Sequence, residues 1–318
     1  MFDVVSVGLL VADVITKPVD KLPGKGLLER VDSVELFSGG NAMTVAVNLK
    51  KIGMNSAVVG NIGKDAFGDF LRGCLRKYGV NTDGVSVDES AQTSTSIVLS
   101  SSDGERTFLH VVGANGTFGL KHINWDVIAD TKIVFVTGSF LMDTFDGAQT
   151  VEFLKKCKEM GKVTALDVCW DAKGRWGDVL NDAMPYIDIF MPSIDEAEKI
   201  AGKTDPTEIA DVFFERGVKS VVIKLGKHGC YIRESKNAKE YVLPTYSEVK
   251  RVDTTGAGDS FCSGFLAAYA KGKSFYECAD FGNATGTHCV MAKGATTGMK
   301  SYEEIEAFMA DYKSKYKM

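Results

Sequence analysis

Hydrophobic residues follow two different spacings along this chain, and these spacings predict strands and helices in turn. Residues 2–8 form a short, mostly apolar run that ends at a glycine, which is typical of a buried strand. In residues 38–53 apolar side chains recur every three or four positions up to Gly53, as in a helix that a glycine ends. Segments of both kinds then alternate to the C-terminus: strands at 56–60, 132–137, 163–167, 187–191 and 219–224, and helices at 66–78, 146–160, 193–216, 259–271, 275–292 and 302–314.

This alternation predicts the fold class. Strands that alternate with helices form a mostly parallel sheet with helices on both faces, so we expect an α/β protein with three α/β/α layers. No repeat, low-complexity tract or linker interrupts the chain, which favours a single domain over 1–318.

Two segments in the N-terminal third break the rhythm. Residues 14–37 are irregular, with short runs that fit exposed strands. Residues 93–112 alternate, are rich in β-branched side chains and carry Asp103-Gly104 at a turn, as in a β-hairpin. We expect these segments to form a small β-sheet inserted as a lid. A further hairpin is expected around 227–243.

Composition and charge narrow the function classes. The formal net charge is -5 and no long basic run occurs, so a nucleic-acid or anionic membrane surface is not expected. No apolar run approaches the ~18 residues of a membrane span, and the N-terminus lacks a signal-peptide pattern. Seven scattered cysteines without a CxxC pair indicate reduced thiols, and four histidines without metal spacing are expected to be structural. These features predict a soluble, cytoplasmic protein.

The stretch RVDTTGAGDSFCSGFLAAY, at 251–269, carries the strongest chemical signal. Its glycines lead into an apolar helix, where free N–H groups and the helix dipole favour an anion. Asp259 lies in this turn, and a carboxylate beside a phosphate can take the proton of an attacking hydroxyl. Alternatively, Asp259 only complements the helix N-terminus while the glycines shape a turn.

Other polar positions admit a binding role or a structural one. Asp13 follows the first strand at the sheet edge where α/β folds bind ligands, and Asn41 opens a helix behind two glycines. Glu196, after Ser193, is either a magnesium ligand or an acid of a first helical turn. The KLGKHG turn at 224–229 is a plain hairpin or a ledge under a nucleotide. The nearest match to a Walker loop, AAYAKGKS at 267–274, lacks the first glycine, and no GxGxxG follows the first strand.

Two motifs together resemble the ribokinase-like, PfkB-type carbohydrate kinase family. They are SGGNAMTVAVNLKKIGMNSAVVGNIGKDAFGDFL at 38–71 and VDTTGAGDSFCSGFLAA at 252–268. The resemblance covers nearly the whole chain in order and includes GERTF at 104–108. It implies a ribokinase-like fold and the transfer of phosphate from ATP to a hydroxyl group.

The resemblance also implies roles for individual residues. Asp259 is similar to the catalytic base, and the anion hole of the family corresponds to Gly256, Ala257 and Gly258. Acceptor contacts correspond to Asp13, Gly39, Gly40 and Asn41. The ATP-binding positions correspond to Ser193, Lys224, Gly226, Gly229 and Asn283. Glu196 is similar to the acid tied to Mg²⁺, largely through water, and Asp253 and Thr255 match positions that help to hold a monovalent cation such as K⁺ in some members.

Two departures from the family pattern affect these expectations. Ser193 replaces the asparagine of the NxxE motif, although its hydroxyl still forms hydrogen bonds. The segment LDVCWDAKGRW, at 166–176, differs from the DxNxRxxLW pattern of many fructokinases and so argues against fructose.

The expected reaction is transfer of the γ-phosphate of ATP to a primary hydroxyl of a small sugar or sugar acid, with Asp259 ionised at pH 7 as the general base. A nucleoside acceptor stays open, as does a binding regulator without catalysis, although the intact GAGD motif argues against the latter. Unpaired strand edges on the lid favour a homodimer.

Overall fold

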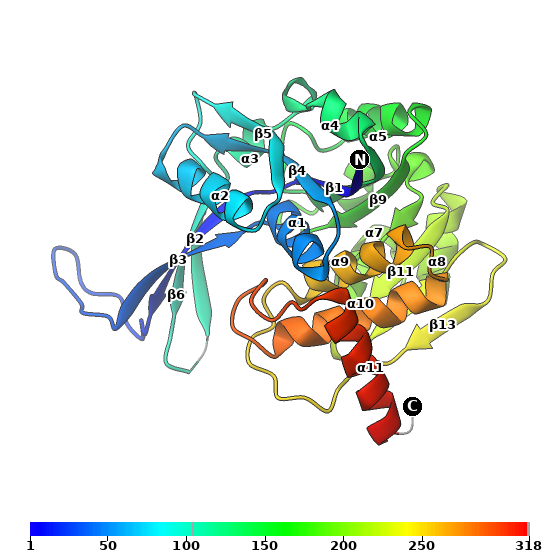
Figure 1. Cartoon of the computed structure of the whole chain (residues 1–318). Coiled ribbons are helices and arrows are strands. Elements are labelled where there is room, and N and C mark those ends of the chain that lie inside the picture. Colours follow the sequence, from blue (N-terminus) through cyan, green and yellow to red (C-terminus); the bar gives the residue numbers. More distant parts are fainter. Residues whose placement is uncertain (104, 317–318) are drawn as a thin grey trace.

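The computed structural model describes residues 1–103 and 105–316, so Gly104, in the expected hairpin turn, lies outside the described residues. A nine-stranded sheet runs through this part of the chain in the order β13-β12-β11-β10-β9-β8-β1-β4-β5 (Figure 1). Its strands are β1 (Phe2–Gly8), β4 (Ser56–Gly63), β5 (Asn81–Asp88), β8 (Thr131–Ser139), β9 (Val163–Val168), β10 (Ile189–Phe190), β11 (Ser220–Lys224), β12 (Cys230–Arg233) and β13 (Glu240–Leu243). Pairing is parallel from β11 to β5 and antiparallel for the β11–β12 and β12–β13 pairs.

Helices cover both faces of this sheet because successive strand residues point to opposite sides. Val5 packs into one apolar cluster and the adjacent Val4 into another. The first cluster includes residues of α4 (Trp125–Ala129), α5 (Ala148–Glu159), α6 (Trp176–Leu180), α7 (Ile194–Ala201) and α8 (Pro206–Glu215). The opposite face carries α1 (Asn41–Ile52), α2 (Ala66–Lys77), α9 (Ala257–Ala270), α10 (Phe275–Val290) and α11 (Tyr302–Tyr316).

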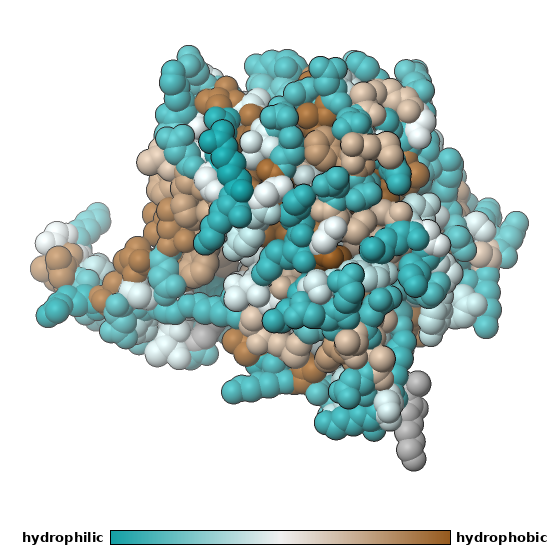
Figure 2. Space-filling model, in the orientation of Figure 1, coloured by the Kyte–Doolittle hydropathy of each residue, from teal (hydrophilic) through white to brown (hydrophobic). Residues whose placement is uncertain are grey.

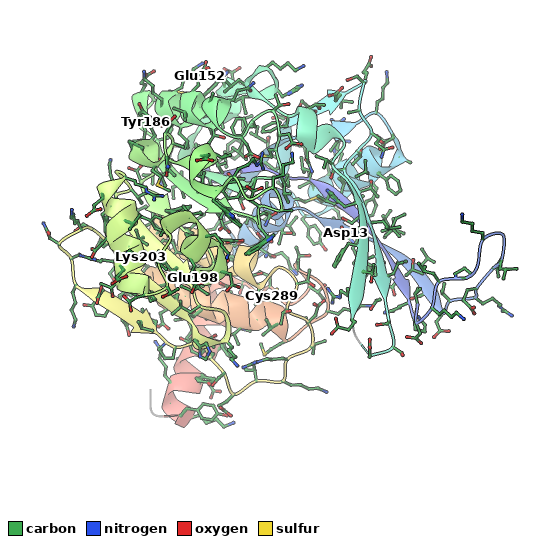
Figure 3. The ribbon with its side chains drawn as sticks, turned by 180° about the vertical axis from the view of Figure 1, so that it is seen from behind. Asp13, Glu152, Tyr186, Glu198, Lys203 and Cys289 are labelled. Atoms are coloured by element: carbon green, nitrogen blue, oxygen red, sulfur yellow. The ribbon has the colours of Figure 1, made fainter. Side chains whose placement is uncertain are left out.

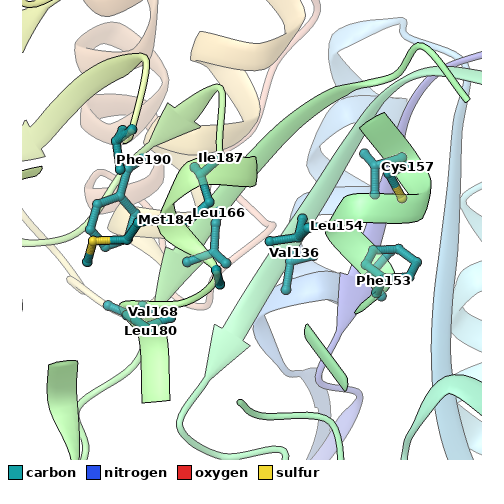
Figure 4. Packing of buried hydrophobic residues seen from close by; sticks show 14 of the residues in the cluster. Val136, Phe153, Leu154, Cys157, Leu166, Val168, Leu180, Met184, Ile187 and Phe190 are labelled. Atoms are coloured by element: carbon teal, nitrogen blue, oxygen red, sulfur yellow. The ribbon is translucent and has the colours of Figure 1, made fainter. Parts of the chain in front are cut away.

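The core is densely filled on both sides of the sheet. Figure 4 shows Val136 and Leu166, on neighbouring strands, facing the helix that carries Phe153 and Leu154, and all four side chains are fully buried. Burial of each such side chain is worth about 1.5–3 kcal/mol. This packing makes the main sheet a rigid base for the residues at its edge.

A second, four-stranded sheet projects from the body (Figure 1) in the order β3-β2-β6-β7. Its strands are β2 (Val11–Lys17), β3 (Ser33–Gly39), β6 (Thr95–Ser100) and β7 (Arg106–Val111). Only Leu9 and Leu10 separate β1 of the main sheet from β2 of this small sheet. The short helix α3 (Ala114–Thr117) follows β7 and returns the chain to the body.

The three-layer fold and the small inserted sheet predicted from the sequence are confirmed. The structure adds β5, which the sequence pattern did not reveal because NTDGVSVD contains Asn, Asp and Gly, residues that are depleted in strands. The strand expected at 187–191 has only two paired residues, whereas the hairpin expected around 227–243 is present as β12 and β13.

The state of the cysteines and the length of the helices can be stated for the described residues. All seven cysteines are free thiols, five of them buried. Among the described residues, every helix is too short or too polar to cross a membrane.

Candidate active site

The N-terminus of α9 lies at the centre of the candidate site. Gly256 precedes the helix with φ 75° in the left-handed region, and a Cβ at this position would lie 2.3 Å from the Cβ of Ala295. Only glycine therefore allows this turn. The first helical turn presents N–H groups that the helix itself does not use, although the N–H of Ala257 also donates to the carbonyl of Thr254 at 3.2 Å. The turn therefore stays a candidate anion site.

Asp259 lies in this first turn and is held by a short chain of hydrogen bonds. Asn41, the first residue of α1, donates from Nδ2 to Oδ1 of Asp259 at 2.8 Å. The thiol of Cys169 donates to the other end of the same amide, Oδ1 of Asn41, at 3.4 Å. The thiol thus orients the amide so that its NH₂ group faces the carboxylate.

Desolvation raises the pKa of Asp259 to about 7, and the Asn41 hydrogen bond only partly opposes this rise. The expectation of an ionised Asp259 rested on the ordinary pKa of an aspartate, and burial brings the pKa of this carboxyl much closer to neutrality. A base with a pKa close to the working pH suits proton transfer.

Asp13 lies on β2 where the small sheet leaves the body, as Figure 3 shows. Its carboxylate packs against the backbone of Gly39, where a Cβ would lie 2.1 Å from Oδ2 of Asp13. The next residue, Gly40, has φ 89°, and a Cβ there would lie 2.4 Å from the carbonyl oxygen of Leu9. The two glycines are therefore required for the close approach of the α1 N-terminus to Asp13.

A cavity of about 330 Å³ extends from Asp13 between the small sheet and the body. Burial raises the pKa of Asp13 to about 6, although a hydrogen bond with Ser96 opposes the rise. We refer to this cavity as the acceptor-side cavity. It is lined by Leu9, Val11, Asp13, Gly40, Asn41, Ser96, Phe108, His110, Asn115 and Leu141.

Asn115 fixes the backbone at the point where the two sheets join. Its side chain accepts from the N–H of Leu10 at 3.2 Å and donates to the carbonyl of Leu10 at 3.0 Å. Because Asn115 is buried, this paired contact holds the start of β2, and hence Asp13, in position.

On the opposite side of Asp259, Lys224 at the end of β11 forms a buried ion pair with Asp167 at the end of β9, with Nζ and Oδ2 2.5 Å apart. Burial alone would lower the pKa of Lys224, but nearby anionic groups, Asp167 foremost, hold it above its ordinary value. The ammonium group lies beside the first turn of α9, 3.5 Å from the position of a Cβ on Gly258. Its positive charge therefore adds to the field of the helix N-terminus.

Glu196 faces the same cavity as Asp167 and Asp259. Burial raises its pKa, and Lys224 opposes this rise. Glu196 also accepts from the N–H of Ser193 at 2.8 Å, so the structural role considered for this acid, in the first turn of a helix, is present. This contact engages one oxygen, Oε2, and a carboxylate has further acceptor sites.

A third cavity, of about 210 Å³, lies beyond Gly258, between the β11–β12 turn and helices α9 and α10; we call it the nucleotide-side cavity. Lys224, Gly226, Gly229 and Asn283 line it, whereas Ser193, which the sequence analysis grouped with them, lines the cavity of Glu196 instead. Asn283 is buried and donates to the carbonyl groups of Leu243 and Pro244 at 3.3 and 3.2 Å, so it also supports the wall. Most of the remaining lining is apolar or small: Thr245, Tyr246, Val249, Ala257, Phe261, Gly286, Thr287 and Val290.

Asp253 and Thr255, just before the glycine turn, bind a side chain of the small sheet. Arg106 on β7 donates from Nη2 to Oδ1 of Asp253 at 3.0 Å and from Nη1 to the hydroxyl of Thr255. These contacts join the small sheet to the turn that carries Asp259.

Several residues of the site escaped the sequence interpretation. Asp167 is a single acid inside a strand, and the partner of Arg106 is 147 positions away. His110 was expected to be structural, but it lines the acceptor-side cavity and lies 3.0 Å from the hydroxyl of Ser96. The alternation of residues 106–110 was the available signal, because it places His110 and Phe108 on the same face as Arg106.

The described residues contain no group of three or more His, Cys, Asp or Glu side chains that could form a metal cage by themselves. Two carboxylates, Asp167 and Glu196, nevertheless face one cavity with Asp259. This oxygen-rich set suits Mg²⁺, which keeps several waters and takes few protein ligands when phosphates complete its shell.

The chain is similar to known kinases over nearly its full length. Residues 1–301 match the model of the pfkB family carbohydrate kinases. The ATP-dependent 6-phosphofructokinase of Thermoanaerobacterium thermosaccharolyticum is 28% identical over 96% of this chain and 93% of its own, and the 2-dehydro-3-deoxygluconokinase of Bacillus subtilis is 27% identical over 90% of each. The structure of Arabidopsis thaliana ribokinase complexed with ribose and ATP superposes with a TM-score of 0.84, at 25% identity, over 97% of this chain and 98% of that one.

Proposed function

The chain belongs to the pfkB family of carbohydrate kinases and is a phosphotransferase with an alcohol acceptor, and we propose that it transfers the γ-phosphate of ATP to a primary hydroxyl of a small sugar or sugar acid, with Asp259 as the general base. The observation that carries this proposal is the position of Asp259, which is hydrogen-bonded to Asn41 of the acceptor-side cavity and shares a helical turn with Ala257 and Gly258 of the nucleotide-side cavity. A carboxylate between an acceptor and a nucleotide can take the proton of the attacking hydroxyl.

Each reactant is assigned to one cavity. The acceptor lies in the acceptor-side cavity, where the carboxylate of Asp13 binds its hydroxyl groups and Gly39 and Gly40 allow its close approach. ATP lies in the nucleotide-side cavity, with its adenine against the apolar wall near Val290. The α9 N-terminus lies where the two reactants meet.

The protein residues then act on the transferred group and on one proton. Asn41 engages Oδ1 of Asp259, so we assign Oδ2 to the acceptor hydroxyl. The backbone of Gly256, Ala257 and Gly258 and the ammonium of Lys224 stabilise the negative charge of the phosphoryl group, and such preorganised donors are worth about 10²–10³-fold each. Mg²⁺, held by ATP and by Glu196 directly or through water, would neutralise part of the phosphate charge.

The small sheet serves as a lid in this mechanism. It covers the acceptor-side cavity with Ser96, Phe108 and His110, and it contacts the body through Arg106. Closure over the acceptor would exclude water, which otherwise competes for the phosphoryl group.

The test combines a substitution with an acceptor panel. ADP release is measured with neutral sugars, sugar acids, sugar phosphates and nucleosides, and the best acceptor is then used to compare Asp259→Asn with the native protein. We expect kcat to fall at least 10²–10⁴-fold, the usual contribution of a general base. Asp195→Asn, an exposed acid on α7, is the matched control and should retain native turnover.

The panel also separates the alternatives. A nucleoside kinase would use nucleosides best, and a regulator without catalysis would release no acceptor-dependent ADP. Near-native turnover by Asp259→Asn would show that Asp259 is not the base.

We also propose that the protein forms a homodimer through the outer face of the lid. Leu36, Val14, Ile97 and Leu109 are aligned across all four strands, on the face opposite Asp13. Leu36, Ile97 and Leu109 are 40, 42 and 60% exposed, and Figure 2 shows brown apolar residues on the projecting sheet. An exposed apolar sheet face of this kind favours association.

Light scattering after size exclusion tests the dimer. Leu109→Glu should convert a dimer of the native chain to a monomer, because it places a charge in the apolar row formed by Leu36, Val14, Ile97 and Leu109. Leu28→Glu is the control, since Leu28 is exposed in the β2–β3 loop and lies outside the row. A native chain that is monomeric at tens of micromolar would contradict the proposal.

A further inference from the structure

Asp253 joins three parts of the molecule through one carboxylate. Its Oδ1 accepts from Nη2 of Arg106 at 3.0 Å and from the N–H and hydroxyl of Thr255 at 3.0 and 2.8 Å. Its Oδ2 accepts from the N–H of Gly294 at 3.0 Å. The carboxylate is almost fully covered, with 8% of the side chain exposed, so it needs a compensating positive charge.

An inorganic cation at this place would need several oxygen atoms with lone pairs directed to it. The nearby oxygens already accept hydrogen bonds from the chain. The hydroxyl of Thr255 accepts from Arg106, and the carbonyl of Thr255 accepts from the thiol of Cys289 at 3.3 Å. The carbonyl of Ala295 accepts from the same thiol at 3.6 Å and from Ser260 at 3.4 Å. This arrangement does not fit the monovalent cation that the sequence resemblance implied.

We propose that the guanidinium of Arg106 is the permanent monovalent cation of this kinase, brought to Asp253 by the lid. The inference rests on the proposed function, since it concerns the turn that would bind the transferred phosphate. Asp253 lies three residues before Gly256, and its negative charge would otherwise repel phosphate from the turn. Burial alone would raise the pKa of Asp253, yet hydrogen bonds from Thr255, Gly294 and Arg106 lower it to about 2, so this charge is permanent.

The positive charge of Arg106 comes from the small sheet, and its effect therefore depends on the position of that sheet. Arg106 belongs to β7 of the small sheet, whereas Asp253 and Thr255 belong to the body. The positive charge therefore reaches the anion-binding turn only when the lid is closed. A closed lid also covers the acceptor, so Arg106 couples acceptor binding to completion of the phosphate site. Arg106 acts here as a positioning residue, because it touches Asp253 and Thr255 rather than the reactants.

The first experiment compares KCl with N-methylglucammonium chloride at constant ionic strength. The native protein should turn over at the same rate, within about twofold, in both salts. Arg106→Ala should lose about tenfold or more in kcat, and K⁺ or guanidinium should restore part of the loss. Stimulation of the native protein by K⁺ of about tenfold or more would overturn the inference.

Thermal unfolding gives a readout that is independent of turnover. K⁺ should raise the Tm of Arg106→Ala relative to N-methylglucammonium and leave the native Tm unchanged. Arg106→Lys keeps the charge but loses the two-pronged contact, so it should fall between the native protein and Arg106→Ala. Lys17→Ala removes a cation from the same face of the lid, where Lys17 pairs with Glu35, and should behave as the native protein does.

A third measurement tests the coupling. The ratio of ATP hydrolysis to phosphoryl transfer should rise in Arg106→Ala and stay native in Lys17→Ala. An unchanged ratio together with an unchanged kcat in Arg106→Ala would contradict the proposal. A native protein that phosphorylates no acceptor would instead contradict the proposed function, so the two failures are distinct.

Discussion

The acceptor-side cavity and the nucleotide-side cavity are built in different ways. The acceptor-side cavity uses side chains with specific geometry, such as Asp13, Asn41 and His110, and two of these, Asp13 and His110, come from the small sheet that we propose as a lid. The nucleotide-side cavity uses small residues, apolar surface and backbone turns of the body, for example near Gly229, where a Cβ would lie 1.9 Å from the carbonyl oxygen of Leu243. Under the proposed function, the shape of the backbone would accommodate the phosphate donor, whereas side chains, which substitutions can change, would select the acceptor.

The largest effect should come from the glycine turn that precedes Asp259. In Gly256→Ala the new methyl group would press on Ala295, 2.3 Å away, and displace the turn. We expect a loss of about 10²–10³-fold in kcat, as for removal of one donor to a developing anion. The control is Gly272→Ala, since Gly272 has φ 76° but open space around it. It should cost about 1–2 kcal/mol of stability through strain alone and leave kcat unchanged. Equal loss of kcat in both variants would contradict this reading.

The second prediction is that protonation of Asp259 lowers kcat/KM for the acceptor. Asp259, with a pKa of about 7, must be deprotonated to act as a base, so activity is present above pH 7 and is lost as the pH falls. With saturating Mg-ATP, kcat/KM for the acceptor should fall about 100-fold between pH 8 and pH 5, since a single base loses about tenfold per unit below its pKa. The groups that face Asp259 are Asp167, Lys224 and Glu196. A flat pH profile would contradict the assignment.

The same shifted pKa has a consequence for stability. The folded state binds the Asp259 proton more tightly than the unfolded chain, whose value is near 3.8, so stability decreases as the pH rises from about 4 to about 7. Asp259→Asn removes this decrease. The variant should therefore have a higher Tm than the native protein at pH 8, and the difference should shrink at pH 5, as measured by calorimetry.

The third prediction separates the two cavities directly. Asp13→Asn should raise KM for the acceptor about 10–100-fold, because a buried carboxylate that accepts from substrate hydroxyls is replaced by a group that also donates. KM for ATP should stay native. Asp32→Asn, an exposed acid of the same small sheet region, is the control. Equal changes in both KM values would show that the cavities are not independent.

The smallest effect should come from the nucleotide side. Val290→Ala removes part of an apolar wall, and about two buried methylene equivalents at ~0.8 kcal/mol each predict an increase in KM for ATP of up to about 15-fold. Steady-state kinetics with the acceptor at saturation measure this, and kcat should hardly change. A loss in kcat as large as that of Gly256→Ala would mean that Val290 acts on the chemistry.

Local patterns predicted the elements and the centre of the site, but not the contacts between distant segments. The turn before Asp259 was recognisable because its glycines and the apolar helix adjoin in sequence. Asp167 was not recognisable as a site residue, since its role depends on the ion pair with Lys224, 57 positions later. The pKa of Asp259 depends on desolvation by surrounding elements and so departed from the expected value. β5 was missed because tertiary pairing with β4 outweighs the poor strand propensity of its residues.

Because β1 leads almost directly into β2, a rotation of the small sheet about this junction would move its distant residues farther than its near ones. Asn115 holds the backbone of Leu10 through two hydrogen bonds, so we take Leu10 as the fixed point of such a rotation. Asp13 lies three residues from Leu10, which is roughly 10 Å at about 3.3 Å per strand residue. Arg106 pairs with Ser100, which lies beside Lys17, and Lys17 is seven residues or roughly 23 Å from Leu10. A given rotation moves Arg106 about twice as far as Asp13. Under the proposed closure of the lid, a small displacement at Asp13 would therefore correspond to a larger displacement of Arg106 toward or away from Asp253.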